Sequence, residues 1–369
     1  MAIAKLHERS APPSADNPVR VMVVDDSAVI RGIIAQTLEA SGQVKVVGSA
    51  SNGADAVAMV TRFDVEVLIL DIEMPVLDGL AALPKLLQAA PDVKIIMASS
   101  LTLNGAEISL KALRLGATDY IPKPTVGTLY SAAEFKREIV AKVLGLCRSH
   151  RTKPRPADAN GRPAPVTAPP VSLRKPSMVP PRVLGIGSST GGPQALITLL
   201  SSLPASVTLP IVLVQHMPPV FTRHLADQLG RVAKRPAQEA VDGMPIERGK
   251  LYVAPGGFHM IAEQRERGPV LRVNQEPPEN FCRPAVDPMF RSLAAVYGKA
   301  TLAAVLTGMG SDGTHGAQAI AAAGGTVLAQ DEASSVVWGM PGAAAAAGVC
   351  SALIPIKDFG ARIAELATG

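Results

Sequence analysis

The sequence predicts an α/β protein of two domains, each with a mostly parallel sheet covered by helices. Short β-branched runs alternate with helical patterns along both halves of the chain, which is typical of strands buried in a parallel sheet. Hydrophobic residues occupy 47% of the 369 positions but aromatic residues only 3%, so Ala, Val, Leu and Ile must fill the cores. A proline-rich stretch separates the halves, and the length allows two cores of ordinary size.

The first half begins with two apolar runs that end in carboxylates. Residues 19–24 are followed by Asp25 and Asp26, and residues 65–70 are followed by Asp71. The carboxyl ends of parallel strands share one edge of a sheet, so the three acids should converge there. They would repel one another without a cation, and an all-oxygen site suits Mg²⁺ shared with a phosphoryl group. Asp26 alone could instead be a helix N-cap, but three converging acids are not explained that way.

A hydroxyl residue and a lysine complete this pattern. Ser99 follows the strand-like residues 94–98, and Lys123 follows the next apolar run. Over residues 19–146 the order of acids, hydroxyl and lysine resembles the receiver domain of bacterial response regulators, a (βα)5 fold. The resemblance implies that Ser99 is the switch hydroxyl and that Lys123 pairs with phosphoryl oxygens.

The resemblance also implies roles for the acids. Asp71 would be the phosphoacceptor, and Mg²⁺ would be bound by Asp26, Asp71 and the backbone carbonyl of Glu73, with Asp25 acting through water. A carboxylate is a poor nucleophile toward an anionic donor unless a metal ion and an ammonium group neutralise charge during the transfer. The chemistry of these residue types therefore agrees with the implied roles.

Composition argues against several other classes of protein. The net charge is +5, but Lys and Arg are scattered and no aromatic residues interleave with them, so nucleic-acid binding is not expected. Cys147, Cys282 and Cys350 are too few and too far apart for a disulfide framework or a zinc site, which favours a reducing cytoplasm. No signal peptide opens the chain and no apolar run has the length of a membrane span, so membrane insertion is not expected.

The segment between the two halves is predicted to be a linker. Residues 147–181 are rich in Pro, which removes backbone donors and fixes φ, so neither helix nor strand is expected over most of it. The polar residues 1–18 are predicted to be disordered. These limits leave residues 19–146 for the first domain and 182–369 for a doubly wound second domain.

The first turn of the second domain carries a candidate nucleophile. Gly187, Ser189 and Gly191 have the spacing of a nucleophile elbow, in which glycines permit a sharp strand-to-helix turn that presents the hydroxyl. The same loop could instead bind phosphate at a helix N-terminus, and the loop alone does not decide between the two. It is not a dinucleotide fingerprint, because Thr190 occupies the last glycine position.

A serine nucleophile needs a base at the same edge of the sheet. Of six histidines, only His216 directly follows a predicted buried strand, residues 211–215. The orienting acid should come from another strand end, and Asp312 lies in a glycine-rich turn of this kind. Asp312 could also be a helix N-cap, and Asp287 and Asp331 are rival acids in settings less like a loop.

Six segments of the second half are similar to the C-terminal domain of the chemotaxis protein-glutamate methylesterases, the CheB family. They span about residues 182–366 and read GIGSSTGGP, VQHMPPVFTRHLADQL, YVAPGGFHM, RPAVDPMF, LTGMGSDG and EASSVVWGMP. The resemblance implies that Ser189 is the nucleophile, His216 the general base and Asp312 its orienting acid. It implies a hydrolase domain without a cofactor of its own.

The family also implies a reaction and partners. Hydrolysis of glutamate methyl esters on methyl-accepting chemotaxis receptors would release methanol, and the same site would deamidate receptor glutamines. Thr190 and the backbone N–H of Met309 would lie beside the oxyanion. A chemotaxis histidine kinase would phosphorylate Asp71 and so relieve blockage of the site by the first domain. The chain is expected to be a cytoplasmic monomer.

Three other classes of protein are alternatives to this one. A response regulator with a degenerate, protein-binding effector domain would have no reason to carry the serine, histidine and aspartate together. A DNA-binding regulator would need a helix-turn-helix after the linker, where strands and helices alternate instead. A general serine hydrolase would act on small soluble esters, which an assay against methylated receptor can distinguish.

Overall fold

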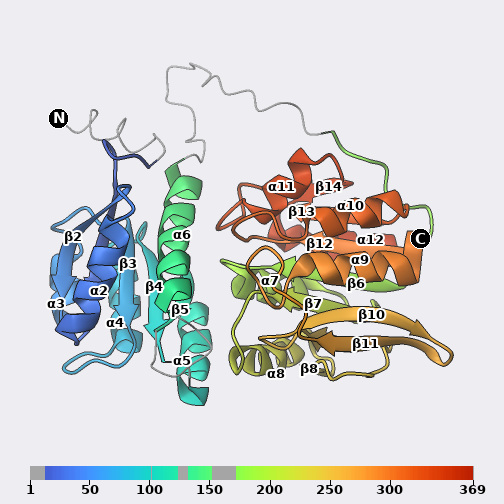
Figure 1. Ribbon diagram of the computed structural model, residues 1–369, viewed down its shortest axis with the longest axis horizontal. Coiled ribbons are helices and arrows are strands. Elements are labelled where there is room, and N and C mark those ends of the chain that lie inside the picture. The colour runs from blue at the N-terminus through green and yellow to red at the C-terminus, as the bar shows by residue number, and fades with distance from the viewer. Residues whose placement is uncertain (1–12, 101, 124–131, 152–171, 369) are drawn as a thin grey trace. The chain divides into compact units, whose positions relative to one another are not determined.

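The computed structural model separates the chain into two compact units, residues 1–153 and 154–369 (Figure 1). The predicted disorder of residues 1–12 and most of the predicted linker lie outside the described residues. Residues 13–18 form a bend in which Ser14 and Asn17 exchange two backbone hydrogen bonds. No helix in the described part of the chain is long and apolar enough to cross a membrane. The described residues are 13–100, 102–123, 132–151 and 172–368.

The first unit is a five-stranded parallel sheet in the order β2-β1-β3-β4-β5, as the (βα)5 prediction requires. Val24 at the end of one central strand pairs with Leu70 of the next, so the predicted acids lie at the same edge of the sheet. The strands are β1 (Val19–Val24), β2 (Val44–Ala50), β3 (Val67–Asp71), β4 (Lys94–Ser99) and β5 (Asp119–Pro122). The helices are α2 (Ala28–Glu39), α3 (Gly53–Met59), α4 (Gly79–Ala89), α5 (Leu103–Arg114) and α6 (Ala132–Arg151).

The N-terminus of α2 shows whether Asp26 is a helix N-cap. Its N-cap is Ser27, whose hydroxyl accepts a hydrogen bond from the N–H of Ile30. The N–H of Ser27 itself donates to Asp25 Oδ1 at 2.9 Å. Asp26 therefore does not cap the helix, and the N-cap interpretation of Asp26 is wrong.

The ends of the predicted linker are ordered parts of the two units. Helix α6 continues past residue 146 to Arg151. In the second unit, the N–H of Arg174 donates to the carbonyl of Cys350 at 2.9 Å, and the N–H of Ser177 donates to Thr326 Oγ1 at 2.8 Å. Residues 172–181 thus belong with the second unit, which matters for the design of fragments.

The second unit is built on a seven-stranded parallel sheet in the order β14-β13-β12-β6-β7-β9-β8. The chain starts at the centre and adds strands on one side before crossing to the other, which is the doubly wound arrangement. The strands of the sheet are β6 (Val183–Ser188), β7 (Ile211–Gln215), β8 (Ala237–Glu239), β9 (Leu251–Val253), β12 (Thr301–Val305), β13 (Thr326–Gln330) and β14 (Ala352–Ile354). The helices are α7 (Gly192–Ser202), α8 (Phe221–Ala233), α9 (Val286–Tyr297), η1 (Gly298–Ala300), α10 (Thr314–Ala322), α11 (Met340–Ala346), η2 (Ile356–Asp358) and α12 (Phe359–Thr368).

One apolar run of the second half lies outside this sheet. Residues 270–273 belong to β11 (Gly268–Asn274), which pairs antiparallel with β10 (His259–Arg265) in a separate two-stranded hairpin. Only residues 266 and 267 join the two strands, and a parallel pair needs a far longer crossover connection.

Close packing of α9 on the central strand brings a helix N-terminus to the candidate site. A Cβ built at Gly187 would lie 2.4 Å from Val286 Cγ1, the first residue of α9. Only glycine at this position allows the helix to approach so closely. The residues after the hairpin, which lead into α9, are thereby held beside the carboxyl end of β6.

Candidate active site and acidic cluster

Ser189 lies in the turn between β6 and α7, where the elbow spacing predicts a presented hydroxyl. Its N–H donates to the carbonyl of Thr307 at 3.0 Å, and its carbonyl accepts from the N–H of Gly192 at 2.7 Å. Gly191 has φ +74°, in the left-handed region that favours glycine. Ser189 is half-buried, whereas its neighbour Ser188 is fully buried, so only Ser189 can meet a substrate.

The loop after β12 lies directly against this serine. A Cβ at Gly308 would be 2.9 Å from Ser189 Cβ, so a backbone without a side chain passes the nucleophile there. Met309 is the next residue along that loop. Thr190, the residue after Ser189, is buried and its hydroxyl has no hydrogen-bond partner within the described residues. Thr190 thus adjoins Ser189 in the chain, and the loop that carries Met309 passes beside Ser189.

His216 directly follows β7, the strand that pairs with β6, at the same edge of the sheet. The sheet register pairs Ser188 with Gln215, and the N–H of His216 donates to the carbonyl of Ser188 at 3.1 Å. His216 Nε2 lies 2.7 Å from Asp312 Oδ2. The three predicted residues thus follow the carboxyl ends of β6, β7 and β12, and the side chains of His216 and Asp312 are in contact. Within the described part of the chain, the Ser189 hydroxyl itself makes no hydrogen bond, and such contacts often form only with substrate bound.

Asp312 is held as an ionised carboxylate. Its side chain is buried, which raises its pKa, but His216 and several N–H donors outweigh burial and lower the pKa to about 2. An ionised carboxylate can only accept hydrogen bonds, so Nε2 of His216 carries a hydrogen and donates it to Asp312 in a hydrogen bond. The other donors to its carboxylate are the N–H groups of Val286, Asp287 and Gly313 and the side-chain amide of Asn280.

The two rival acids have other partners. Asp287 is buried behind Asp312, where its carboxylate accepts from the N–H of Gly316 at 2.6 Å and from the Asn280 amide at 3.0 Å. Burial and the nearby Asp312 charge raise the pKa of Asp287. Asp331 accepts from the N–H and hydroxyl of Ser334. Asp312 is the acid that contacts the histidine.

A cysteine contacts the second ring nitrogen of His216. The Cys282 sulfur lies 3.5 Å from Nδ1, although 66 positions separate the two residues. Burial lowers the pKa of His216, but the contacts with Cys282 and Asp312 outweigh burial and raise it to about 10. This contact is one that the sequence does not indicate, because nothing in the spacing links the two residues.

A buried amide ties the nucleophile to the base. Gln215 Nε2 donates to the carbonyls of Ser189 and His216 at 2.9 and 3.1 Å, and Gln215 Oε1 accepts from the Ser188 hydroxyl at 2.7 Å. Sequence reasoning missed this clamp. The available signal is that polar Ser188 and Gln215 end two otherwise apolar buried strands.

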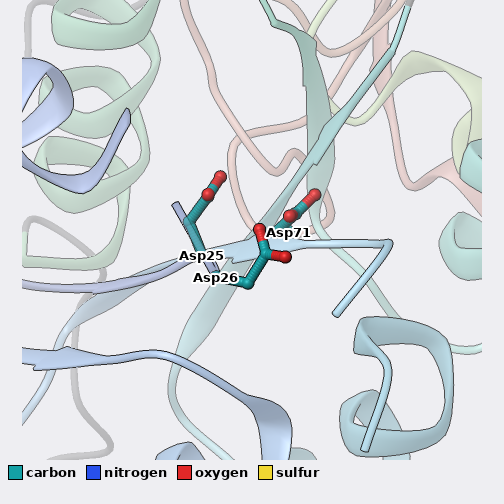
Figure 2. A group of neighbouring side chains, drawn as sticks. All are labelled: Asp25, Asp26 and Asp71. Carbon is teal, nitrogen blue, oxygen red and sulfur yellow. The ribbon is translucent and has the colours of Figure 1, made fainter. Parts of the chain in front are cut away.

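The three acids of the first unit form a cluster at the ends of β1 and β3 (Figure 2). One carboxylate oxygen from each of Asp25, Asp26 and Asp71 lies within 4.8 Å of the others. Lys123 Nζ is 2.6 Å from Asp25 Oδ2 and 2.7 Å from Asp71 Oδ1. Burial raises the pKa of Asp71, and the lysine lowers it in part. Such a set of hard oxygen donors fits Mg²⁺.

The remaining predicted residues of this unit lie at or just after the ends of strands β4 and β3. Ser99 ends β4, is buried, and its hydroxyl accepts from that of Ser109 in α5 at 2.9 Å. Glu73 comes two residues after β3 and its side chain is exposed. The Glu73 carboxylate is not among the three that cluster, so a role in this site would fall to its backbone carbonyl.

Known proteins are similar to the chain over both units. Residues 184–363 match the family model described as CheB methylesterase, and residues 21–134 match that of the response regulator receiver domain. The protein-glutamate methylesterase/protein-glutamine glutaminase 1 of Paramagnetospirillum magneticum is 52% identical, over 97% of this chain and 98% of that protein. The protein-glutamate methylesterase/protein-glutamine glutaminase of Azospirillum brasilense is 51% identical, over 95% of this chain and 93% of that protein. The chain therefore belongs to the CheB family, in which a receiver domain precedes a methylesterase domain.

Proposed function

We propose that this chain is a phosphorylation-activated hydrolase that demethylates glutamate methyl esters and deamidates glutamines on methyl-accepting chemotaxis receptors. The observation that carries the proposal is the half-buried Ser189 on a strand-to-helix turn beside the His216–Asp312 pair. The relatives bear both activities in their names. A degenerate effector would have no need to keep this geometry.

The chemistry follows that of serine hydrolases. Ser189 Oγ attacks the ester carbonyl while His216 accepts its proton, and collapse of the tetrahedral intermediate passes that proton to departing methanol. Water then attacks the acyl-enzyme with His216 again as base, which releases the glutamate side chain. With a glutamine substrate the leaving group is ammonia. Asp312 stays ionised and stabilises the imidazolium that forms.

The charge that develops on the carbonyl oxygen needs donors. We assign this role to the backbone N–H groups of Thr190, in the same turn as Ser189, and Met309, in the loop after β12. Each donor of this kind contributes about 3 kcal/mol of transition-state stabilisation. The glycine at 308 supports the assignment, because it allows the second loop to come within reach of the nucleophile.

In the receiver domain, Asp71 would accept a phosphoryl group from a chemotaxis histidine kinase. Mg²⁺, held by Asp26, Asp71 and the Glu73 carbonyl and by Asp25 through water, would neutralise the charge on the transferring group. Lys123 already contacts the two buried acids and would turn to the phosphoryl oxygens. Ser99 would exchange Ser109 for the phosphoryl group, which couples phosphorylation to α5.

Methanol release from methylated receptor membranes tests the proposal directly. The whole chain should release methanol, and faster after addition of Mg²⁺ and a phosphodonor. A chain that hydrolyses a small chromogenic ester equally well but leaves methylated receptor intact would instead be a general serine hydrolase. A chain without either activity would point to a degenerate effector domain.

Changing Asp312 to Asn should lower the rate of methanol release by roughly 10²–10⁴-fold, less than loss of the nucleophile. The acid forms no bond, but without its charge the imidazolium is less stable and the tautomer of His216 is no longer set. Since Asp312 raises the pKa of His216, the acidic limb of the pH–rate profile should also move to lower pH. Asp331→Asn, whose carboxylate contacts Ser334 instead, is the control. Equal losses in both variants would contradict the assignment.

A fragment of residues 172–369 should fold and should be more active than the unphosphorylated whole chain. It keeps the two hydrogen bonds that residues 172–181 make with the second unit, which a fragment starting at 182 would lose. If the receiver restrains the esterase through an interface that one phosphoryl group can switch, that interface is worth only a few kcal/mol, and its removal should mimic phosphorylation. Methanol release at equal concentrations measures this. A folded fragment slower than its parent would mean that the receiver assists the reaction.

A further inference from the structure

The two ring nitrogens of His216 have different partners. Nε2 lies 2.7 Å from Asp312, and Nδ1 lies 3.5 Å from the Cys282 sulfur. Because ionised Asp312 can only accept, Nε2 carries a hydrogen, and Nδ1 is then the nitrogen with the basic lone pair. That lone pair must take the Ser189 proton in the proposed reaction. In this structure it faces a thiol.

The turn that carries this thiol is held in place through Glu279. Glu279 and Cys282 exchange two backbone hydrogen bonds, at 2.8 and 3.2 Å. The Glu279 carboxylate is bound by both terminal nitrogens of Arg291 in α9. Asn280 and Phe281 have φ of 52° and 62°, a conformation that costs free energy in residues other than glycine. These contacts therefore hold the backbone from which the Cys282 side chain extends.

The same turn also holds the catalytic acid. The Asn280 amide nitrogen lies 3.0 Å from Asp312 Oδ1 and 3.0 Å from Asp287 Oδ2. One short segment thus contacts the acid through Asn280 and the base through Cys282. Acid, base and thiol form a continuous line of contacts, Asp312–His216–Cys282.

We propose that Cys282 is a positioning residue of this site, whose thiol gives its proton to Nδ1 of His216 in the resting enzyme and so restrains the base. The inference rests on the proposed function of His216. The proton leaves sulfur and binds nitrogen, so the pair becomes thiolate and imidazolium without change of net charge. A protonated imidazole cannot accept the Ser189 proton.

The electrostatics of the site favour this transfer. The Asp312 carboxylate on the far side of the ring stabilises an imidazolium, as in other cysteine–histidine pairs. After burial, which lowers it, the largest influence on the pKa of His216 is Cys282, which raises it. The other charged or titratable groups of this region contact neighbours of the His216 ring and not the ring itself. They are Asp287 with His315 next to Asp312, the Glu279–Arg291 pair of the turn, and His259 and Arg283 next to the turn.

The pH dependence of methanol release tests the restraint. Cys282→Ala and Cys282→Ser should both move the acidic limb of kcat/KM to lower pH by about one to three units, because His216 then stays neutral at lower pH. Serine keeps the shape and a hydroxyl donor but does not ionise. The same shift in both variants would therefore be due to loss of the ionisable thiol and not to a change in packing. Cys147→Ala, which removes a buried thiol of the first unit, should leave the limb in place. A limb that stays, or moves to higher pH, in the Cys282 variants overturns the proposal.

The alkylation rate of Cys282 gives a readout that does not need the esterase. Iodoacetamide should react with Cys282 of the whole chain about tenfold faster near neutral pH than in His216→Ala, since the thiolate is the nucleophile. Cys147 and Cys350 are buried and serve as slow internal references in the same peptide map. Equal Cys282 rates in the two proteins would refute the thiolate–imidazolium pair. If Ser189 proved dispensable while the Cys282 rates still differed, the proposed function would fail and the pair would stand.

Discussion

Replacing Ser189 by Ala is expected to abolish both methanol release and glutamine deamidation, by roughly 10⁴-fold or more in rate. The hydroxyl is the only group in the turn that is both half-buried and adjacent to the His216–Asp312 pair, and no acyl-enzyme can form without it. Folding should be unaffected, because the Ser189 contacts that stabilise the turn are made by its backbone N–H and carbonyl. Methanol release from methylated receptor, with thermal unfolding of the same sample, measures both effects.

Ser188 provides the sharpest control for this result. Its hydroxyl is fully buried and donates to Gln215 Oε1 at 2.7 Å. Ser188→Ala leaves that amide oxygen without its donor and should lower the free energy of unfolding by about 1–3 kcal/mol while the nucleophile remains. Ser201→Ala, on the exposed end of α7, should change neither quantity. Turnover near that of the parent in Ser189→Ala, together with loss in Ser188→Ala, would move the nucleophile to Ser188.

Replacing Asp71 by Asn should remove all activation by a phosphodonor and leave only basal esterase activity. Asparagine is nearly isosteric but is not a nucleophile toward phosphorus, and the change removes one negative charge from the acidic cluster. Lys123 keeps its contact with Asp25, so the edge of the sheet should remain intact. Phosphoryl incorporation and methanol release, each with and without Mg²⁺ and phosphodonor, check the expectation.

A matched substitution separates loss of the acceptor from loss of charge. Asp92→Asn removes one negative charge from an exposed position in the same unit and should leave phosphorylation and activation as they were. Full activation of Asp71→Asn by the phosphodonor would mean that another residue accepts the phosphoryl group or that activation bypasses the receiver.

Sequence alone predicts the architecture because local patterns report burial. Apolar β-branched runs mark the strands of both sheets, and polar residues directly after those runs mark the edge where ligands bind. For this reason Asp25, Asp71 and His216 could be selected from their position after a strand, without any knowledge of contacts. The exception among the strands is residues 270–273, where the pattern of a buried strand does not say which sheet the strand joins.

Tertiary structure alone decides which neighbours those side chains have. The sequence favours Asp312 over Asp287 only by its more loop-like setting. The packing of α9 against the turn before α10 is what places Asp312, and not Asp287, in contact with His216. Spacing cannot link Cys282 to a ring 66 positions away, nor show which nitrogen it faces. Periodicity reports whether a side chain is buried, whereas hydrogen-bond partners depend on loops whose geometry is set by contacts distant in sequence. The restraint that we infer on His216 is a property of that loop geometry, which is why the sequence predicts the reaction but not its control by the thiol.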